Sequence, residues 1–224
     1  MTEITSTDIQ LKRPSDAWLR IMSHLYDPFL WLGEHAAMRR RRRELLRNAV
    51  GRVVEIGAGT GLNVGHYPDG IADLVLVEPE PAMRRRLERR LQRQARTARI
   101  VDAPAERLPL ADASVDTVVS TLVLCTVDDP ASALREIARV LRPNGRLLFI
   151  EHVRADSKLR AAWQDRLFEP WRRFGGGCHC NRATVELMRA SGFEISADGA
   201  AWRAMPPIVR PLMVGQATAG QATR

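Results

Sequence analysis

The stretch VVEIGAGTGLN, residues 53–63, decides how the rest of the chain is interpreted. An apolar run typical of a buried strand ends directly in glycines at every second position, and the start of a helix follows. Those glycines are Gly57, Gly59 and Gly61. Glycine suits such a turn because the backbone takes unusual dihedral angles and a ligand has to approach it closely. The stretch therefore predicts a ligand-binding loop at the end of a strand.

The spacing of this loop separates two classes of ligand. A dinucleotide-binding fingerprint would need its third glycine one position later, where Leu62 stands. Glu55 lies just before the loop, and a carboxylate there suits a cationic ligand better than a pyrophosphate. Both observations weigh against a nicotinamide-dependent oxidoreductase.

Apolar runs alternate with helical patterns along the chain, which is typical of βαβ units in a mostly parallel sheet. Strands are expected at residues 52–56, 74–78, 99–102, 115–120, 146–152, 193–197 and 212–216. Helices are expected at residues 81–95, 130–141 and 182–190, within 15–48, and over the amphipathic part of the segment 153–180. The pattern predicts an α/β fold.

Acidic residues follow the ends of the second and third expected strands. Glu78 ends the second strand, where a carboxylate can accept both hydroxyls of a ribose. Asp102 and Glu106 follow the third strand, where the edge of a base would lie. Ligands of open parallel sheets bind at the carboxyl ends of the strands, so these acids and the glycine loop are expected to share one site.

Four motifs in this order, EIGAGTG, VEP, AERLPLADASVD and RVLRPNGRL, resemble the class I S-adenosylmethionine-dependent methyltransferases over residues 50–152. The resemblance implies a Rossmann-like doubly wound sheet of seven strands, mostly parallel with the last strand antiparallel, and helices on both faces. It implies S-adenosylmethionine as cofactor, with the glycine loop against its methionine part and Glu78 on its ribose. The remaining cofactor positions that we assign are Glu55, Asn63, Pro79, Ala105, Glu106, Thr121 and Leu122.

A narrower resemblance covers STLVLCTV (120–127), EHV (151–153) and the spacing of Gly177, Cys178 and Arg182. These motifs are similar to those of the alkyl-thiol methyltransferases of animal membranes and their bacterial relatives. The resemblance implies a small apolar acceptor methylated on a thiol sulfur. We expect this chain to depart from that subgroup in having no long hydrophobic N-terminal anchor, and Cys180 stands where leucine is expected.

Other functions stay open at this point. The acceptor could be a lipid amine, a phenol or another secondary metabolite, and the cysteines could instead bind arsenite for methylation. A non-enzymatic module that binds nucleic acid or a membrane through its arginine runs is a further alternative.

The acceptor side is expected to follow the fourth and fifth strands. His152, at the tip of the fifth strand, and His179 are the candidate catalytic residues. A thiol with a pKa near ~8.5 is partly ionised at neutral pH, so a base is helpful without being required. The residues expected to line the substrate pocket are Cys125, Cys178, Arg182, Tyr26 and Trp31. No metal site is expected, because the triplet 178–180 has no second pair of ligands elsewhere.

Three divisions of the chain follow from these assignments. Residues 1–48 are expected to form a helical lid over the site, residues 49–216 the methyltransferase domain, and residues 217–224 a flexible tail. Within the domain, residues 153–180 are expected to form an acceptor-binding insertion.

The charge and composition of the chain indicate which kinds of binding partner to expect. The formal net charge is +8, and the arginine runs at 39–43 and 84–86 fall on expected amphipathic helices. Few aromatic residues lie near them to stack on bases, so they predict solvated helix faces and no nucleic-acid partner. Three cysteines and no signal peptide predict a cytoplasmic protein with a small-molecule acceptor as its partner. Peripheral membrane contact and the oligomeric state stay open.

Overall fold

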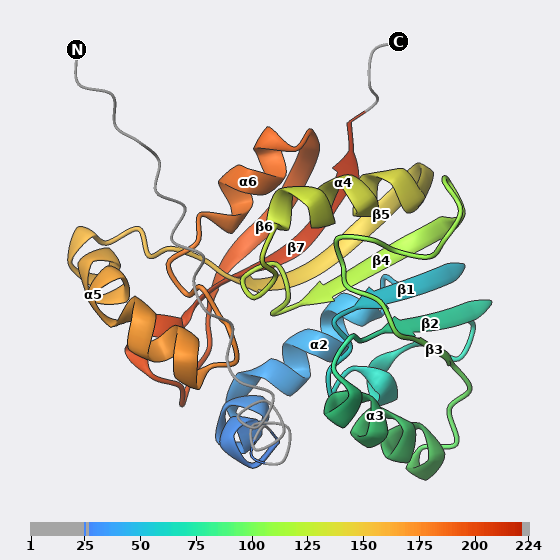
Figure 1. The fold of residues 1–224 in the computed structure, drawn as a ribbon, viewed down its shortest axis with the longest axis horizontal. Helices are drawn as coiled ribbons and strands as arrows, with labels where there is room; N and C mark the ends of the chain where they lie inside the picture. Colours follow the sequence, from blue (N-terminus) through green and yellow to red (C-terminus); the bar gives the residue numbers. More distant parts are fainter. Residues whose placement is uncertain (1–24, 26, 221–224) are drawn as a thin grey trace.

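Seven strands form a single sheet in this computed structural model, which describes residues 25 and 27–220 (Figure 1). The strands are β1 (Arg52–Ile56), β2 (Asp73–Val77), β3 (Arg99–Val101), β4 (Val115–Thr121), β5 (Leu141–His152), β6 (Phe193–Ala201) and β7 (Pro211–Ala219). Their order in the sheet is β3-β2-β1-β4-β5-β7-β6. Only β7 is antiparallel, and it pairs with both β5 and β6. The predicted doubly wound α/β fold is confirmed.

Helices cover both faces of the sheet (Figure 1). They are α2 (Arg39–Leu46), α3 (Pro81–Arg93), α4 (Pro130–Val140), α5 (Lys158–Phe174) and α6 (Thr184–Ala190), with short turns η1 (Glu34–Met38), η2 (Val64–His66) and η3 (Pro207–Val209). Successive strand residues point to opposite faces. Val53 accordingly packs in the apolar cluster that contains side chains of α2 and α3, whereas Val54 packs with those of α4 and α6.

The ends of α3 and α4 show why the helices begin where the sequence predicted. Each has a proline at its first position, which lacks the N–H that a first helical turn leaves unused. The carboxylate just before it caps the helix: Glu80 accepts the N–H of Ala82, and Asp129 accepts the N–H of Ser132.

The last hairpin is longer than predicted. β6 and β7 pair from Phe193 opposite Ala219 to Ala201 opposite Pro211. Residues 217–219, expected in the tail, are therefore part of the sheet, while residues 221–224 lie outside the described residues. The added positions are mostly small or polar, so they carried no apolar alternation, but pairing with a neighbouring strand needs only the backbone.

The start of β5 also differs from the prediction. The helix was expected to end at residue 141 and the strand to begin at residue 146, yet Leu141 already pairs with Val115. The register shifts before Arg146, and Asn144 has a φ of 67°. Residues 142–145 therefore form an irregularity within the strand.

Two further helical segments lie outside the sheet: α5 and the residues before α2. α5 lies beyond the carboxyl ends of the central strands (Figure 1), and the described residues contain no helix long and apolar enough to cross a membrane. Residues 27–33 are helical and lead into η1 and α2. Residues 1–24 and Tyr26 of the expected lid lie outside the described residues.

Candidate active site

Two glycines of the loop, Gly57 and Gly61, pack tightly against neighbouring side chains, whereas Gly59 has free space beside it. Gly57, Gly59 and Gly61 all have a positive φ, which side chains rarely adopt. A Cβ on Gly57 would lie 2.6 Å from Val123, and one on Gly61 would lie 2.6 Å from Leu87. A Cβ on Gly59 would meet nothing closer than a backbone oxygen at 3.9 Å. The loop thus presents bare backbone to the space above Gly59, as a bound ligand requires.

Glu78 lies directly beside this loop. Its two carboxylate oxygens accept the N–H of Gly59 at 2.7 Å and the N–H of Glu80 at 2.9 Å. Each oxygen thereby retains capacity for a further donor. Burial raises the pKa of Glu78 above its ordinary value. A carboxylate fixed by two N–H groups beside an open glycine loop fits the two ribose hydroxyls of the cofactor that the sequence implies.

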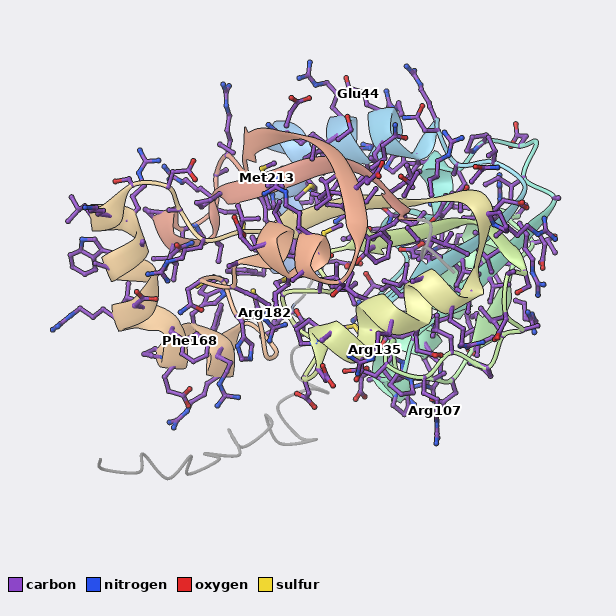
Figure 2. The ribbon with its side chains drawn as sticks, turned by 90° about the horizontal axis from the view of Figure 1, so that it is seen from above. Glu44, Arg107, Arg135, Phe168, Arg182 and Met213 are labelled. Carbon is purple, nitrogen blue, oxygen red and sulfur yellow. The ribbon has the colours of Figure 1, made fainter. Side chains whose placement is uncertain are left out.

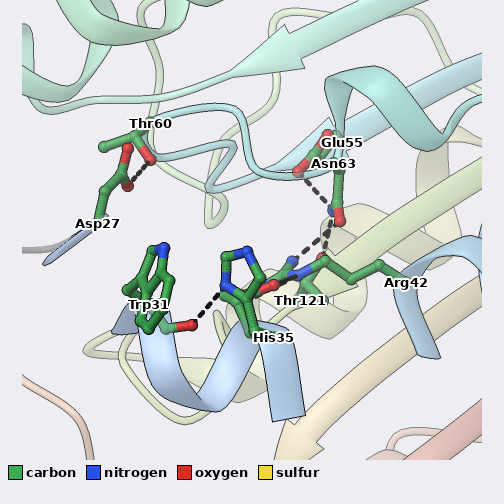
Figure 3. Close-up of polar contacts among 9 residues, drawn as sticks. Asp27, Trp31, His35, Arg42, Glu55, Thr60, Asn63 and Thr121 are labelled. Carbon is green, nitrogen blue, oxygen red and sulfur yellow. Dashed lines mark hydrogen bonds and ion pairs between the residues drawn. The ribbon is translucent and has the colours of Figure 1, made fainter. Parts of the chain in front are cut away.

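Glu55 takes part in a buried polar network rather than facing the ligand with a free carboxylate (Figure 3). One of its oxygens accepts from Asn63 Nδ2 at 2.8 Å and the other from the Tyr67 hydroxyl at 2.6 Å. Asn63 also donates to Thr121 Oγ1 at 2.6 Å and accepts from Arg42 at 2.9 Å. Burial raises the pKa of Glu55 to about 7. Glu55 therefore holds the loop through Asn63, and its contact with a cationic ligand stays a prediction.

Arg42 and Asp27 were missed as members of the site. Arg42 belongs to an arginine run predicted to be solvated, but it is buried and forms an ion pair with Glu34 at 2.9 Å. Asp27 accepts from Thr60 in the glycine loop at 2.6 Å and from Arg90 of α3 at 2.5 Å. The acidic residues Asp27 and Glu34 of the N-terminal segment were the only sign of these contacts in the sequence. The sequence alone does not show that they pair with Thr60, Arg90 and Arg42.

The remaining cofactor positions lie at the carboxyl edge of the sheet. Ala105 is buried, and Glu106 accepts the N–H of Asp129 at 3.4 Å. Leu122 has a φ of 62° and donates its N–H to Ile150 at 2.8 Å, which turns the chain sharply away from β4. Pro79 is exposed. The roles assigned to these residues stay predictions, and their placement is compatible with them.

The N-terminal helical residues contact both sides of the site. Phe29 packs against Phe174 and Trp171, with ring centroids 5.3 and 6.5 Å apart. Gly33 approaches Trp202 so closely that a Cβ would lie 2.5 Å from its Nε1. Together with the Asp27 contacts, this segment bridges the glycine loop and the C-terminal half of the chain. Trp31, expected in the pocket, is instead 57% exposed and lies against His35.

Three predicted acceptor residues come together in one buried cluster: Cys125, His152 and Cys178. His152 Nδ1 lies 3.5 Å from Cys125 Sγ and 3.4 Å from Cys178 Sγ, and the two sulfurs are 3.8 Å apart. The hydrogen bond from Cys178, together with burial, raises the pKa of Cys125 well above its ordinary value, so its thiol is neutral. The His152 ring stacks on Trp202, and its Nε2 has no hydrogen-bond partner among the described residues.

Arg182 was expected to line the pocket, but its guanidinium fastens the loop after β4. It donates to the carbonyl oxygens of Leu124 at 2.5 Å and Val127 at 3.0 Å. Figure 2 shows Arg182 between the core of the molecule and the side formed by α5, where Phe168 is labelled. Arg182 therefore acts on the site by positioning the loop that carries Cys125.

Glu151 was not predicted as a site residue, but it lies next to His152 and holds the loop that carries Cys125. Its buried carboxylate accepts from the Ser120 hydroxyl at 2.6 Å and from three successive backbone N–H groups. These belong to Val123, Leu124 and Cys125, at 3.0, 3.2 and 3.3 Å. The sequence carried one sign of this role: a charged residue near the end of the apolar run RLLFIEH (146–152). A carboxylate buried in such a strand requires hydrogen-bond donors around it.

The triplet 178–180 does not act as a unit. His179 packs against Phe168 with ring centroids 4.9 Å apart, and burial lowers its pKa to about 4. His179 is therefore neutral and does not join the cluster, although its backbone N–H donates to Cys125 at 2.7 Å. Cys180 is a separate buried thiol, and burial raises its pKa to about 11.

Comparison with known proteins gives the same assignment at the level of family. The family described as "Methyltransferase domain" matches residues 54–149. The chain is 37% identical to Thiol S-methyltransferase TMT1B of Homo sapiens over 84% of its own length and 80% of that protein. It is 36% identical to the Rattus norvegicus protein of the same name, over 77% of this chain and 70% of that one.

The solved structures agree on the fold. A SAM-dependent methyltransferase of Thermotoga maritima, described as a possible histamine N-methyltransferase, superposes with a TM-score of 0.66 at 22% identity. The superposition covers 91% of this chain and 98% of that one. At this identity the likeness concerns the fold alone.

Proposed function

Since this chain belongs to the S-adenosylmethionine-dependent methyltransferases, we propose that it methylates the sulfur of a small apolar thiol. The methyltransferase activity and its cofactor follow from the family. The choice of a thiol is supported most by the identity of 36–37% to thiol S-methyltransferases across more than three quarters of the chain.

The surroundings of the cluster support an apolar acceptor. Cys125 and Cys178 lie in the same apolar cluster as Leu30 of the N-terminal segment and Trp202. The nearby Glu151 carboxylate is already occupied by four donors, so it does not serve as a strong base. A thiol requires little help from a base because part of it is ionised at neutral pH.

The cofactor supplies a methyl group that its sulfonium charge activates for displacement. The protein has to hold the acceptor in line with that methyl group, and orientation alone accounts for much of the rate of such reactions. Glu78 and the glycine loop fix one side, and the loops that carry Cys125 and Cys178 fix the other. The contacts of Asp27 and Phe29 let the N-terminal segment cover the space between them and exclude water.

We also infer that the protein contacts a membrane surface at its periphery. Apolar side chains are exposed on two adjoining helical segments, which meet where Phe29 packs on Phe174. They are Leu25, Phe29 and Leu32 from the N-terminal segment and Leu159, Trp163, Leu167 and Phe174 from α5. Exposed basic residues of α5 flank them: Lys158, Arg160, Arg166 and Arg173. Apolar side chains flanked by cations are typical of helices that lie in the interface of anionic membranes.

A methyl-transfer screen tests the acceptor. The purified protein is incubated with S-adenosylmethionine and with alkyl thiols, amines, phenols or amine-headgroup lipids, and products are identified by mass spectrometry. We expect thioethers as the main products, and none with Glu78→Ala, which removes the proposed ribose contact. Preferred methylation of nitrogen or oxygen would refute the thiol proposal while leaving the family assignment intact.

A further inference from the structure

The cluster of Cys125, His152 and Cys178 offers three ligand atoms at one point. They come from three separate segments, namely the loop after β4, the tip of β5 and the loop after α5. Two sulfurs and one imidazole nitrogen, all within 4.8 Å of one another, are a donor set that soft and borderline metal ions prefer. All three residues are buried, with 0%, 4% and 6% of their surfaces exposed.

The distances match those of a tetrahedral zinc site. Zn–S bonds of about 2.3 Å and Zn–N bonds of about 2.05 Å place two sulfurs about 3.8 Å apart, and a sulfur and a nitrogen about 3.6 Å apart. The observed separations are 3.8 Å between the sulfurs and 3.4 and 3.5 Å between sulfur and nitrogen. The observed separations therefore differ from the tetrahedral values by at most about 0.2 Å, with the ion placed to one side of the plane of the three ligand atoms.

The three ligands are held in place by other contacts. Glu151 accepts the N–H of Cys125, and Cys125 in turn accepts the N–H of His179 at 2.7 Å, which ties the two cysteine loops together. Thr184 donates its hydroxyl to the carbonyl oxygen of His152 at 2.9 Å. Supporting contacts of this kind orient metal ligands before an ion binds and strengthen the binding.

We propose that Cys125 Sγ, Cys178 Sγ and His152 Nδ1 bind one divalent ion of the zinc class, whose fourth position takes the sulfur of the acceptor thiol. Three protein ligands and one open position are typical of catalytic rather than structural zinc sites. The second part of this proposal rests on the proposed function.

The chemistry balances without an added oxidant or reductant. The two cysteines and the acceptor thiol each release one proton to water when their sulfurs ligate the ion. The acceptor sulfur then forms a bond to the methyl carbon while the sulfonium bond to that carbon breaks, and the departing sulfur keeps the electron pair. The products of each turnover are a methyl thioether, S-adenosylhomocysteine and one proton.

Metal binding is tested directly with cobalt and zinc on the full-length protein. The protein is stripped with a chelator under reducing conditions and titrated with Co²⁺, whose thiolate charge-transfer absorption reports cysteine ligands, and then with Zn²⁺ in competition. We expect one ion per chain. Cys125→Ser and Cys178→Ser should each weaken binding by about 100-fold or more. Cys180→Ser is the matched control, since it removes a buried thiol outside the cluster and should bind cobalt as the wild-type protein does.

A second measurement needs no variant. With zinc bound, Cys125 and Cys178 should resist alkylation under mild denaturant while Cys180 reacts, as read from peptide masses. The proposal is overturned if the wild-type protein binds no cobalt, or if Cys180→Ser loses as much cobalt binding as Cys125→Ser and Cys178→Ser.

The fourth position is tested with 1-hexanethiol. Addition of this thiol should change the cobalt spectrum of the wild-type protein, and metal-free protein should methylate it at least ~10-fold more slowly. If metal-free protein methylates the thiol at the full rate, the metal role is refuted and the proposed function stands. If cobalt binds through the cysteines but no thiol is methylated or changes the spectrum, the proposed function fails and the fourth position fails with it.

Discussion

Replacement of Glu78 by glutamine tests the proposed cofactor contact by changing one carboxylate oxygen to an NH₂ group. The carboxylate accepts the N–H groups of Gly59 and Glu80 and, in the proposed complex, both ribose hydroxyls. Glutamine has the same shape, but one of its two oxygens is replaced by an NH₂ group that cannot accept. One ribose hydroxyl therefore loses its acceptor.

The size of the effect follows from the hydrogen bonds that are lost. A hydrogen bond to a charged group contributes about 1.5–3 kcal/mol. Loss of one such bond in Glu78→Gln should weaken S-adenosylhomocysteine binding by roughly 2 kcal/mol, or ~30-fold. Loss of both in Glu78→Ala should cost about 3–6 kcal/mol, which is between two and four orders of magnitude in affinity.

The assay is calorimetric titration with S-adenosylhomocysteine near neutral pH, with thermal unfolding as a check on the fold. Glu80→Gln is the control, because it makes the same change of charge two residues away, where the side chain caps α3 by accepting from Ala82. We expect the control to bind within about two-fold of wild type. If Glu78→Gln binds as tightly as the control, Glu78 does not hold the ribose and the placement of the cofactor is refuted.

The pH dependence of this binding has a defined sign. Burial raises the pKa of Glu78, so the carboxyl takes up a proton earlier than an ordinary glutamate as the solution is acidified. The protonated group accepts more weakly, and affinity for S-adenosylhomocysteine should fall toward acid pH in the wild-type protein. Glu78→Gln should lack that dependence.

Three further predictions concern other parts of the molecule. Glu55 keeps its proton up to about pH 7 in the folded state but releases it near pH 4.5 when unfolded, so the free energy of unfolding should fall by up to ~3 kcal/mol across this window. Denaturant titration at several pH values should show that this dependence is lost in Glu55→Gln. Arg182→Ala should lower kcat for thiols about 10-fold or more while leaving S-adenosylhomocysteine affinity unchanged, since Arg182 holds only the acceptor loop; equal losses in both would contradict this. Trp163→Glu should abolish co-sedimentation with vesicles that contain phosphatidylglycerol without affecting turnover of a water-soluble thiol.

The fold was predictable because its signals are local. β1 has the bounds that the sequence predicted, since a strand-forming run with three β-branched residues ends at a glycine, which strand interiors disfavour. The ends of β6 and β7 were not predictable, because residues such as Gly199 and Thr218 carry no apolar alternation and pair only through their backbones. Propensity marks the apolar centres of strands well and their small or polar ends poorly.

The cofactor side and the acceptor side of the site also differ in how far the sequence predicts them. The cofactor side is encoded within single strand–loop units, so roles for Glu78 and the glycine loop could be predicted from their places at the strand ends and from the family resemblance. The acceptor side depends on which strands are neighbours. β4 and β5 lie side by side, and this places Cys125 near His152, but Cys178 arrives through an irregular loop after α5. Its residue type could be noted in advance, whereas its position beside His152 Nδ1 could not.

The tip of β5 explains how the acceptor side is built. Glu151 and His152 are consecutive, so their side chains point to opposite faces of the strand. Glu151 gathers the backbone of residues 123–125 on one face, and His152 meets the Cys125 side chain on the other. The distance between Cys125 and His152 is therefore set by one strand residue and not by a flexible loop. A buried carboxylate is costly unless it is fully hydrogen-bonded, and here its four donors both offset that cost and fix the loop. Because the same contacts position Cys125 for Cys178, Glu151 determines the geometry of the cluster without touching an acceptor.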